Sequence, residues 1–177
     1  ILMKFLRIFR KVIKIFESLG MDIALAAPTG RAAKRMCEAT GREAKTIHRL
    51  LEVDFGEGDK TPKRDDSAPL VFKRGENNYL DEDAIIIDEA SMIDIFLMDA
   101  LARAIKPGAR LVIIGDSDQL PSVGAGNVLH DLIDSKKFES VRLCEIFRQA
   151  QKSLIVTNTH RIITGEMPLL DVKDNDF

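Results

Sequence analysis

Short runs of consecutive apolar residues recur along this chain, and amphipathic segments lie between them. Such runs are typical of strands buried on both faces of a parallel sheet, and apolar residues every three or four positions are typical of helices packed on it. The predicted strands are Asp22–Ala27, Ala84–Asp88, Arg110–Gly115 and Val141–Cys144, and the predicted helices are Lys4–Leu19, Thr29–Ala39, Thr46–Glu52, Ile93–Ile105, Ala125–Ile133 and Ser153–Ile163. Because strands and helices alternate, the pattern predicts an α/β fold with a parallel sheet.

The first predicted helix is basic and amphipathic. Its apolar stripe consists of Phe5, Phe9, Val12, Phe16 and Leu19, and Lys4, Arg7, Lys11 and Lys14 fall mostly on the other face. This pattern is compatible with a signal-peptide-like or membrane-surface helix. We favour a surface helix that packs on the sheet and ends at Gly20, because a strand follows at once.

The segment Asp54–Tyr79 departs from the alternating pattern because it is polar and contains several glycines and prolines. A loop of this length is uncommon inside a compact domain. Two interpretations remain open: a disordered insertion, or a small hairpin that pairs Leu51–Phe55 with Leu70–Lys73.

Composition narrows the class of protein. A chain of 177 residues, 45% hydrophobic and 31% charged, is typical of one globular domain, with or without a small insertion. The net charge of -2 provides no general attraction to nucleic acid, so any such contact must be local.

Cys37 and Cys144 are far apart, which favours a reducing cytoplasm over a disulfide framework or zinc site. No apolar stretch reaches membrane-spanning length. The first residue is Ile1 rather than Met, which we interpret as an excised, processed or incompletely represented chain.

Two acidic groups follow the most apolar strand. Asp88 and Glu89 come directly after Ile85-Ile86-Ile87, and ligands bind at the carboxyl edge of open parallel sheets. There, one carboxylate can hold Mg²⁺ and the other can orient or deprotonate a water during nucleotide hydrolysis. The alternative is a solvated strand end.

The next strand ends in a comparable way, with Asp116 and Gln119. A glutamine both donates and accepts hydrogen bonds, which suits the sensing of a hydrolytic water or a terminal phosphate. Taken alone, this block reads as a turn that Asp116 caps and Pro121 ends. Its place beside Asp88 and Glu89 favours the functional interpretation.

Two predicted helix starts are candidate anion sites. Thr29, Gly30 and Arg31 open one helix directly after a strand, and free N–H groups, a hydroxyl and a guanidinium suit a phosphodiester backbone. Thr46 and His48 form a weaker second case, in which the histidine can donate to phosphate or stack on a base. A plain N-cap explains either threonine equally well. Arg148 follows the last short strand and can reach a terminal phosphate, although a salt bridge is the commoner role.

In this order, the blocks resemble the first motor domain of superfamily 1 helicases, and most closely the RecD type, the exodeoxyribonuclease V alpha chain. The resemblance covers nearly the whole chain after about Lys14, and the order of four or five blocks makes it specific. The matching blocks are Ala27–Ala33 for motif Ia, Thr46–Leu51 for the following DNA-contacting motif, Ile87–Met92 for motif II, Gly115–Gly124 for motif III and Ile146–Ala150 for motif IV.

The resemblance implies a RecA-like P-loop NTPase motor domain that uses ATP and Mg²⁺ and tracks single-stranded DNA 5′ to 3′ in DNA recombination and repair. It assigns Mg²⁺ to Asp88, the general base to Glu89, γ-phosphate sensing to Gln119 and charge neutralisation to Arg148, with Asp116 also at the nucleotide. It places Thr29, Gly30, Arg31, Thr46 and His48 along the DNA. The implied partner is a second motor domain of the same parent chain, in the cytoplasm. Whether the parent acts alone or with RecB-like and RecC-like subunits stays open. Residues 54–79 lie where the family carries a duplex-splitting hairpin.

The chain departs from the family pattern at its start. No G-x-x-x-x-G-K-[ST] phosphate loop occurs, and Lys4, although near the expected position, lacks the flanking glycines. We therefore expect this chain by itself to hydrolyse ATP negligibly. We also expect either a strand formed by Ile1–Leu6 in the vacant sheet position beside Arg110–Gly115, or self-association through that edge.

Two alternative functions remain open at this level. One is a non-catalytic DNA-binding or subunit-docking module. The other is a motor domain of another superfamily 1 helicase, either relaxase-linked or Pif1-like. The retention of Asp88, Glu89, Gln119 and Arg148 together favours an enzymatic parent protein.

Overall fold

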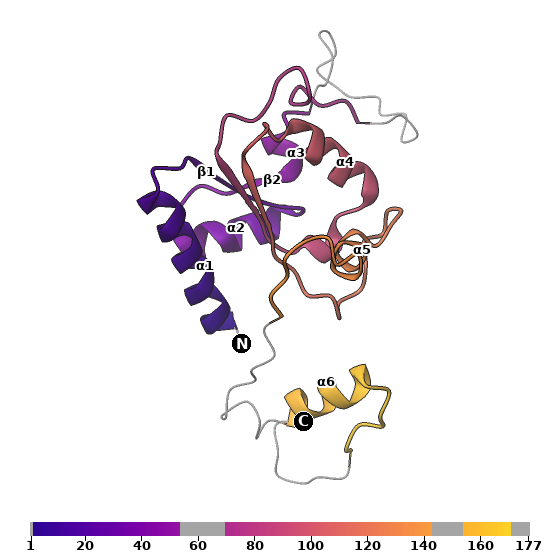
Figure 1. Ribbon diagram of the computed structural model, residues 1–177. Helices are drawn as coiled ribbons and strands as arrows, with labels where there is room; N and C mark the ends of the chain where they lie inside the picture. The colour runs from indigo at the N-terminus through magenta and orange to yellow at the C-terminus, as the bar shows by residue number, and fades with distance from the viewer. Residues whose placement is uncertain (1, 54–69, 143–153, 171–177) are drawn as a thin grey trace. The chain divides into compact units, whose positions relative to one another are not determined.

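The computed structural model describes residues 2–53, 70–142 and 154–170. Leu6–Phe138 form the larger of two compact units and contain the sheet, and the smaller unit contains helix α6 (Leu154–Ile163). Figure 1 shows the strands at the centre of the larger unit. Across the described part of the chain, no helix is both long and apolar enough to span a membrane.

The sheet has four parallel strands in the order β2-β1-β3-β4. Their bounds are Ile23–Ala27 for β1, Lys45–Thr46 for β2, Ala84–Ile87 for β3 and Arg110–Ile113 for β4. The prediction of a parallel α/β sheet is confirmed. The two-residue strand β2 was not predicted, because two residues carry no periodicity. The strand predicted at Val141–Cys144 is absent at residues 141 and 142, and its remainder lies outside the described residues.

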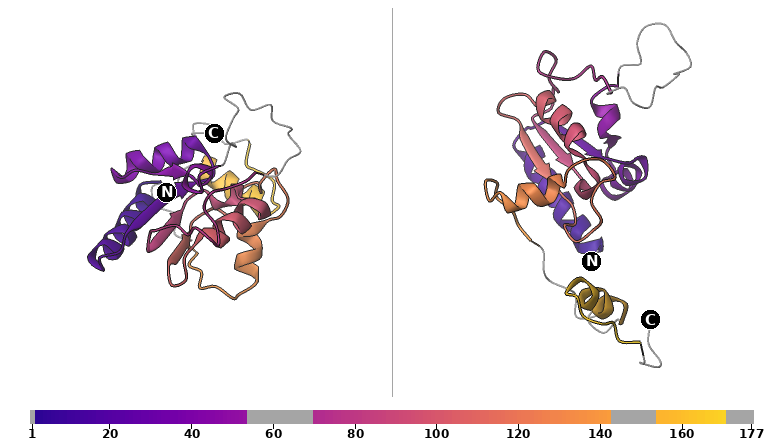
Figure 2. Two further views of the ribbon diagram at one scale, coloured as in Figure 1. Left: turned by 90° about the horizontal axis from the view of Figure 1, so that it is seen from above. Right: turned by 90° about the vertical axis from the view of Figure 1, so that its right-hand side faces the viewer.

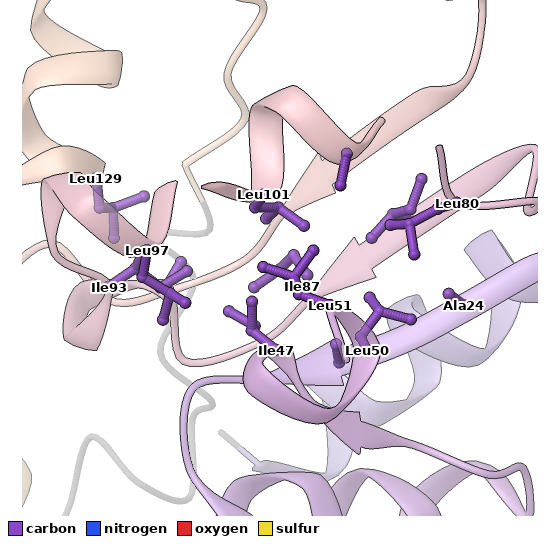
Figure 3. Packing of buried hydrophobic residues seen from close by; sticks show 14 residues of the cluster. Ala24, Ile47, Leu50, Leu51, Leu80, Ile87, Ile93, Leu97, Leu101 and Leu129 are labelled. Carbon is purple, nitrogen blue, oxygen red and sulfur yellow. The ribbon is translucent and has the colours of Figure 1, made fainter. Parts of the chain in front are cut away.

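Side chains of the central strands alternate between two hydrophobic layers. Ile85 and Ile87 face a layer that includes α3 (Ile47–Leu50), α4 (Ile95–Ala104) and α5 (Val128–Asp134). Ala84 and Ile86 face the layer with α1 (Leu2–Ser18) and α2 (Gly30–Thr40). Figure 3 shows the first layer, with Ile87 among Ile47, Leu51 and Leu101. Seen from above in Figure 2, α1 and α5 lie on opposite sides of the strands.

Local capping explains where the helices begin and end. Thr29 accepts a hydrogen bond from the backbone N–H of Ala32 at 3.2 Å, and Asp94 accepts one from that of Leu97 at 2.8 Å. These acceptors satisfy donors that the first helical turn leaves free. Gly41 ends α2 with a φ of 73°, a left-handed conformation that glycine adopts without steric cost.

The start of the chain is helical, and this corrects one expectation. Leu2–Leu6 belong to α1, so the prediction of an N-terminal strand in the sheet is wrong. Phe9, Ile13 and Phe16 of α1 are buried against the sheet, which confirms a surface helix packed on it. The helical periodicity of the apolar residues extends to the start of the chain. It therefore favours a helix there over the strand that three consecutive apolar residues suggested.

Strand β4 is an edge strand: within the described residues it pairs only with β3. No described residue pairs with the other side of β4, and self-association through this edge stays a prediction. The central strands β1 and β3 are paired on both sides.

An antiparallel bridge joins Val53, the residue before the polar segment, to Phe72 within it. The backbone N–H of Lys73 also donates to Glu52 at 2.9 Å. The predicted hairpin would extend from this bridge, but residues 54–69 lie outside the described part of the chain, so the hairpin remains a prediction.

Candidate functional site at the carboxyl edge of the sheet

The four strands end at one edge of the sheet because they are parallel. The register pairs Ala27 with Thr46 and Ile87 with Ile113, the last residues of their strands. The segments that follow these residues carry the predicted site residues. The edge therefore collects Thr29 and Arg31, Thr46 and His48, Asp88 and Glu89, and Asp116 and Gln119.

Asp88 and Glu89 form a sharp turn between β3 and the short 3₁₀ helix η1 (Ala90–Met92). The backbone N–H of Glu89 donates to Oδ1 of Asp88 at 2.9 Å, and the N–H of Asp88 donates to the carbonyl of Ala26 at 3.0 Å. Glu89 has φ 56° and ψ 41°, a left-handed conformation that costs free energy in a residue other than glycine. The turn holds the two carboxylates at the strand end in a defined conformation.

Burial raises the pKa of Asp88 above its usual value of 3.8, and the neighbouring charge of Glu89 raises this pKa further. The hydrogen bond from the N–H of Glu89 and the positive charge of Arg35 act in the opposite direction. A partly buried carboxylate of this kind has a charge that water stabilises incompletely, and a cation can compensate for that loss.

Glu89 makes an ion pair that the sequence did not reveal. Nη2 of Arg35, in α2, lies 3.1 Å from Oε1 of Glu89, with side-chain exposures of 56% and 24% respectively. The only sequence signal is that Arg35 follows Arg31 by four positions, which places both on one side of the helix. The partner of Arg35 depends on how α2 packs beside β1 and β3, so only the tertiary structure identifies it.

Gln119 lies between the two acidic segments. Its Nε2 donates to Oδ2 of Asp116 and its Oε1 lies near Oγ of Ser91, both at 3.5 Å, the long limit for a hydrogen bond. Gln119 thus connects the loop after β4 with η1, the helix that follows Glu89. Ser91 is buried at this junction and was not singled out from the sequence.

Gly115 permits the close approach of these two segments. A Cβ atom at this position would lie 2.8 Å from Cδ2 of Leu129, 3.1 Å from the backbone nitrogen of Ala90 and 3.2 Å from that of Ser91. The backbone N–H of Ala90 donates to the carbonyl of Ile114 at 2.9 Å. The turn after β3 and the loop after β4 are therefore packed backbone to backbone.

Two helix N-termini follow the neighbouring strands β1 and β2 at the same edge of the sheet. Thr29 caps α2, and Thr46 caps the four-residue helix α3 through a 3.2 Å hydrogen bond from the N–H of Arg49. Arg31 is exposed, whereas the ring of His48 is half-buried and its centroid lies 6.0 Å from that of Phe72. Arg148, the remaining predicted site residue, lies outside the described residues.

The oxygen atoms at this edge suit Mg²⁺. This ion prefers oxygen ligands, is bound through one or two carboxylates, and keeps several waters or phosphate oxygens. Asp88 fits that role because burial makes its negative charge costly. Among the residues that the structure describes, no three His, Cys, Asp or Glu side chains converge into a metal site, so these side chains alone do not enclose an ion there.

A parallel sheet with a carboxylate pair at its carboxyl edge is typical of nucleotide-binding α/β proteins, and a family comparison agrees. The model of the AAA domain family (AAA_30) matches residues 7–176, and the chain belongs to this family. The chain is 39% identical over 159 residues to the ATP-dependent RecD2 DNA helicase of Deinococcus radiodurans, an alignment that covers 90% of the chain and 20% of the relative. It is 44% identical over 128 residues to the RecBCD enzyme subunit RecD of Mycobacterium tuberculosis, covering 63% of the chain and 20% of the relative.

These relatives confirm the resemblance to the RecD type of superfamily 1 helicase. The chain spans about a fifth of the length of each of them. Among solved structures, the Pif1 helicase of Candida albicans superimposes with a TM-score of 0.54 at 23% identity, covering 92% of this chain and 39% of that one. At this identity the likeness supports the helicase motor fold only, and the sequence relatives favour the RecD type over the Pif1-like alternative.

Proposed function

We propose that this chain is the first motor domain of an ATP-dependent DNA helicase of the RecD type, which couples ATP hydrolysis to 5′ to 3′ movement on single-stranded DNA in recombination and repair. One observation carries the proposal. The carboxylates expected to support hydrolysis and the helix N-termini expected to hold DNA lie at the same edge of one sheet. A motor needs this proximity, because hydrolysis and DNA contact must affect each other.

In this proposal, each polar group at the edge has a distinct task. Asp88 holds Mg²⁺, which, when bound, neutralises charge on the phosphates. Glu89 orients the attacking water and accepts its proton. Gln119, supported by Asp116, contacts the γ-phosphate, and Arg148 compensates its charge. The 3.5 Å contact between Gln119 and Ser91 would connect the γ-phosphate contact to the turn that carries Glu89.

The DNA would lie along the N-termini of α2 and α3. Thr29, Gly30 and Arg31 contact one phosphate through backbone N–H groups and a guanidinium, and Thr46 and His48 contact the next. These groups meet the sugar-phosphate backbone and not base edges, so binding would be independent of base sequence. The net charge of -2 is consistent with local contacts of this kind.

The proposal requires parts that this sequence does not contain. The phosphate loop, whose backbone N–H groups and lysine hold the β- and γ-phosphates, and a second motor domain would complete the nucleotide site. RecB-like and RecC-like subunits are proposed partners, because one relative is named as a RecBCD subunit. A cytoplasmic location would suit this role and the widely separated cysteines.

The test is Glu89→Gln in the full-length protein that carries this domain. Glutamine preserves the size of the side chain but cannot accept the proton, so ATP turnover should fall about 10²–10⁴-fold while nucleotide binding is retained. DNA-stimulated phosphate release and nucleotide affinity are the two measurements. The matched control is Glu82→Gln, two residues before the start of β3 and at the opposite edge of the sheet, which should leave turnover unchanged. Near wild-type unwinding by Glu89→Gln would favour the non-catalytic DNA-binding or docking module.

A further inference from the structure

The proposed general base is ion-paired to the helix that is proposed to hold DNA. Oε1 of Glu89 contacts Nη2 of Arg35 at 3.1 Å, and Arg35 is the sixth residue of α2, whose first turn carries Gly30 and Arg31. Figure 1 shows α2 beside the strands, directly after β1. A cation on a DNA-contacting helix therefore holds the carboxylate that is expected to drive hydrolysis.

We propose that Arg35 restrains Glu89 when DNA is absent and releases it when a DNA phosphate takes over the guanidinium. This inference rests on the proposed function and adds a regulatory role for a residue outside the expected motifs. While Arg35 holds Glu89, the carboxylate is directed toward α2 and is not free to orient a water. Release makes hydrolysis dependent on DNA.

The structure supports an exchangeable contact. The pair joins through a single nitrogen and a single oxygen, and 56% of the Arg35 side chain is exposed. A guanidinium carries five donors, so Arg35 can meet a phosphate as readily as a carboxylate. Exposed single-contact pairs are weak, so a phosphate that approaches Arg35 can displace Glu89 at little cost.

Glu89 is held in a conformation suited to a switch. Its left-handed backbone, with φ 56°, stores strain at the turn. The backbone N–H of the next residue, Ala90, donates to the carbonyl of Ile114 at 2.9 Å, and Ser91 lies 3.5 Å from Gln119. Only the Glu89 side chain is therefore free to change partners, while the turn that carries it stays fixed.

The first test measures ATP turnover of the full-length protein with and without oligo(dT). Arg35→Gln should raise DNA-free turnover about two- to fivefold, because a weak pair shifts a population by about this factor, and it should reduce the stimulation by DNA. Arg35→Lys retains a positive charge and should restore most of the restraint. The matched control, Arg42→Gln, removes an ion pair to Glu17 beyond the other end of α2 and should change neither quantity.

A second test requires no hydrolysis. If DNA and Glu89 compete for Arg35, removal of the carboxylate must strengthen DNA binding, since coupling between two sites is reciprocal. Glu89→Gln should therefore lower the Kd for fluorescein-labelled oligo(dT) about two- to fivefold in fluorescence anisotropy. In the double variant Arg35→Gln/Glu89→Gln, this gain should disappear relative to Arg35→Gln alone.

The outcomes separate the two proposals. Two results together would overturn the restraint. DNA-free turnover in Arg35→Gln would stay unchanged or fall, and the Kd of Glu89→Gln for DNA would stay unchanged. The proposed function would survive that result if Glu89→Gln still abolished hydrolysis. Full hydrolysis by Glu89→Gln would instead overturn the proposed function itself.

Discussion

At the scale of single residues, two adjacent carboxylates have different environments. Asp88 is partly buried and accepts a hydrogen bond from the following backbone N–H, whereas Glu89 is ion-paired with Arg35. Environment assigns distinct tasks to neighbouring groups of the same chemical type. The partly buried group suits a metal ion, and the ion-paired group suits a role that changes with its partner.

The raised pKa of Asp88 makes a stability prediction. A carboxyl whose pKa is higher in the folded state stabilises the fold when it is protonated. This stabilisation is complete below the unfolded pKa near 3.8 and is lost as pH rises through the folded pKa. At pH 7 the charged form of Asp88 therefore lowers the free energy of unfolding. Asp88→Asn, which can still accept the hydrogen bond from Glu89, should raise the Tm at pH 7 by up to about 4 °C. The gain should vanish below about pH 4.

Asp83 provides the opposite case at the amino end of the same strand. Its hydrogen bond with Lys106 lowers its pKa, and the backbone N–H of Asp22 adds to this effect. The ionised form favours folding above the unfolded pKa, and this stability is lost as pH falls. Asp83→Asn should therefore lower the Tm at pH 7. Calorimetric melting at several pH values measures both variants, and equal shifts in both would contradict the argument.

At the scale of elements, the site depends on how closely the segments after β3 and β4 approach each other. A Cβ at Gly115 would lie 2.8 Å from Leu129 of α5 and 3.1 Å from the backbone of Ala90. Gly115→Ala should therefore destabilise the domain by about 1–3 kcal/mol, the range for an overpacked site. It should also separate η1 from Gln119 and reduce ATP turnover in the full-length protein.

Gly75 serves as the control for this substitution. A Cβ at Gly75 has no heavy atom within 4 Å among its described surroundings. Gly75→Ala should leave the free energy of unfolding within about 0.5 kcal/mol of wild type. Urea unfolding curves compare the two variants. Equal stability of Gly115→Ala and wild type would show that the two segments separate without cost.

At the scale of the whole molecule, the described sheet ends in the two-residue strand β2 on one side and in the longer strand β4 on the other. Within the described residues β4 pairs only with β3, and open edges of apolar strands template pairing with another chain. We therefore predict that this 177-residue chain by itself self-associates through β4 as its concentration rises. Analytical ultracentrifugation over a range of concentrations measures this association.

A pair of substitutions at Leu111 isolates the role of the backbone. The N–H groups of Arg110 and Ile114 donate to β3, so by alternation the N–H of Leu111 points to the open edge. Leu111→Pro removes that donor and should keep the chain monomeric, whereas Leu111→Ala keeps the donor and should still associate. A wild-type chain that stays monomeric throughout would contradict the prediction.

The sequence by itself determined the class of fold and the place of the chemistry. Runs such as Ala84–Ile87 have no polar position at which a strand face can meet water, so they predict strands covered on both sides. Parallel strands bring their carboxyl ends to one edge, so the sequence alone predicts that Asp88 and Gln119 lie near each other. For Thr29 and Thr46 the sequence left an N-cap and an anion site open, and the structure confirms that both cap helices, since capping depends on residues three positions apart.

The tertiary structure alone decided the contacts between elements. The Arg35–Glu89 pair joins residues 54 positions apart, and the packing of α2 on the sheet sets its geometry. Strand β2 exists because Lys45 and Thr46 lie beside β1, and the first residues became part of α1 because Phe9, Ile13 and Phe16 anchor that helix on the sheet. Local patterns in the sequence indicate periodicity and capping. Which surfaces the folded chain brings together decides the ion pair, the two-residue strand and the conformation of the apolar first residues.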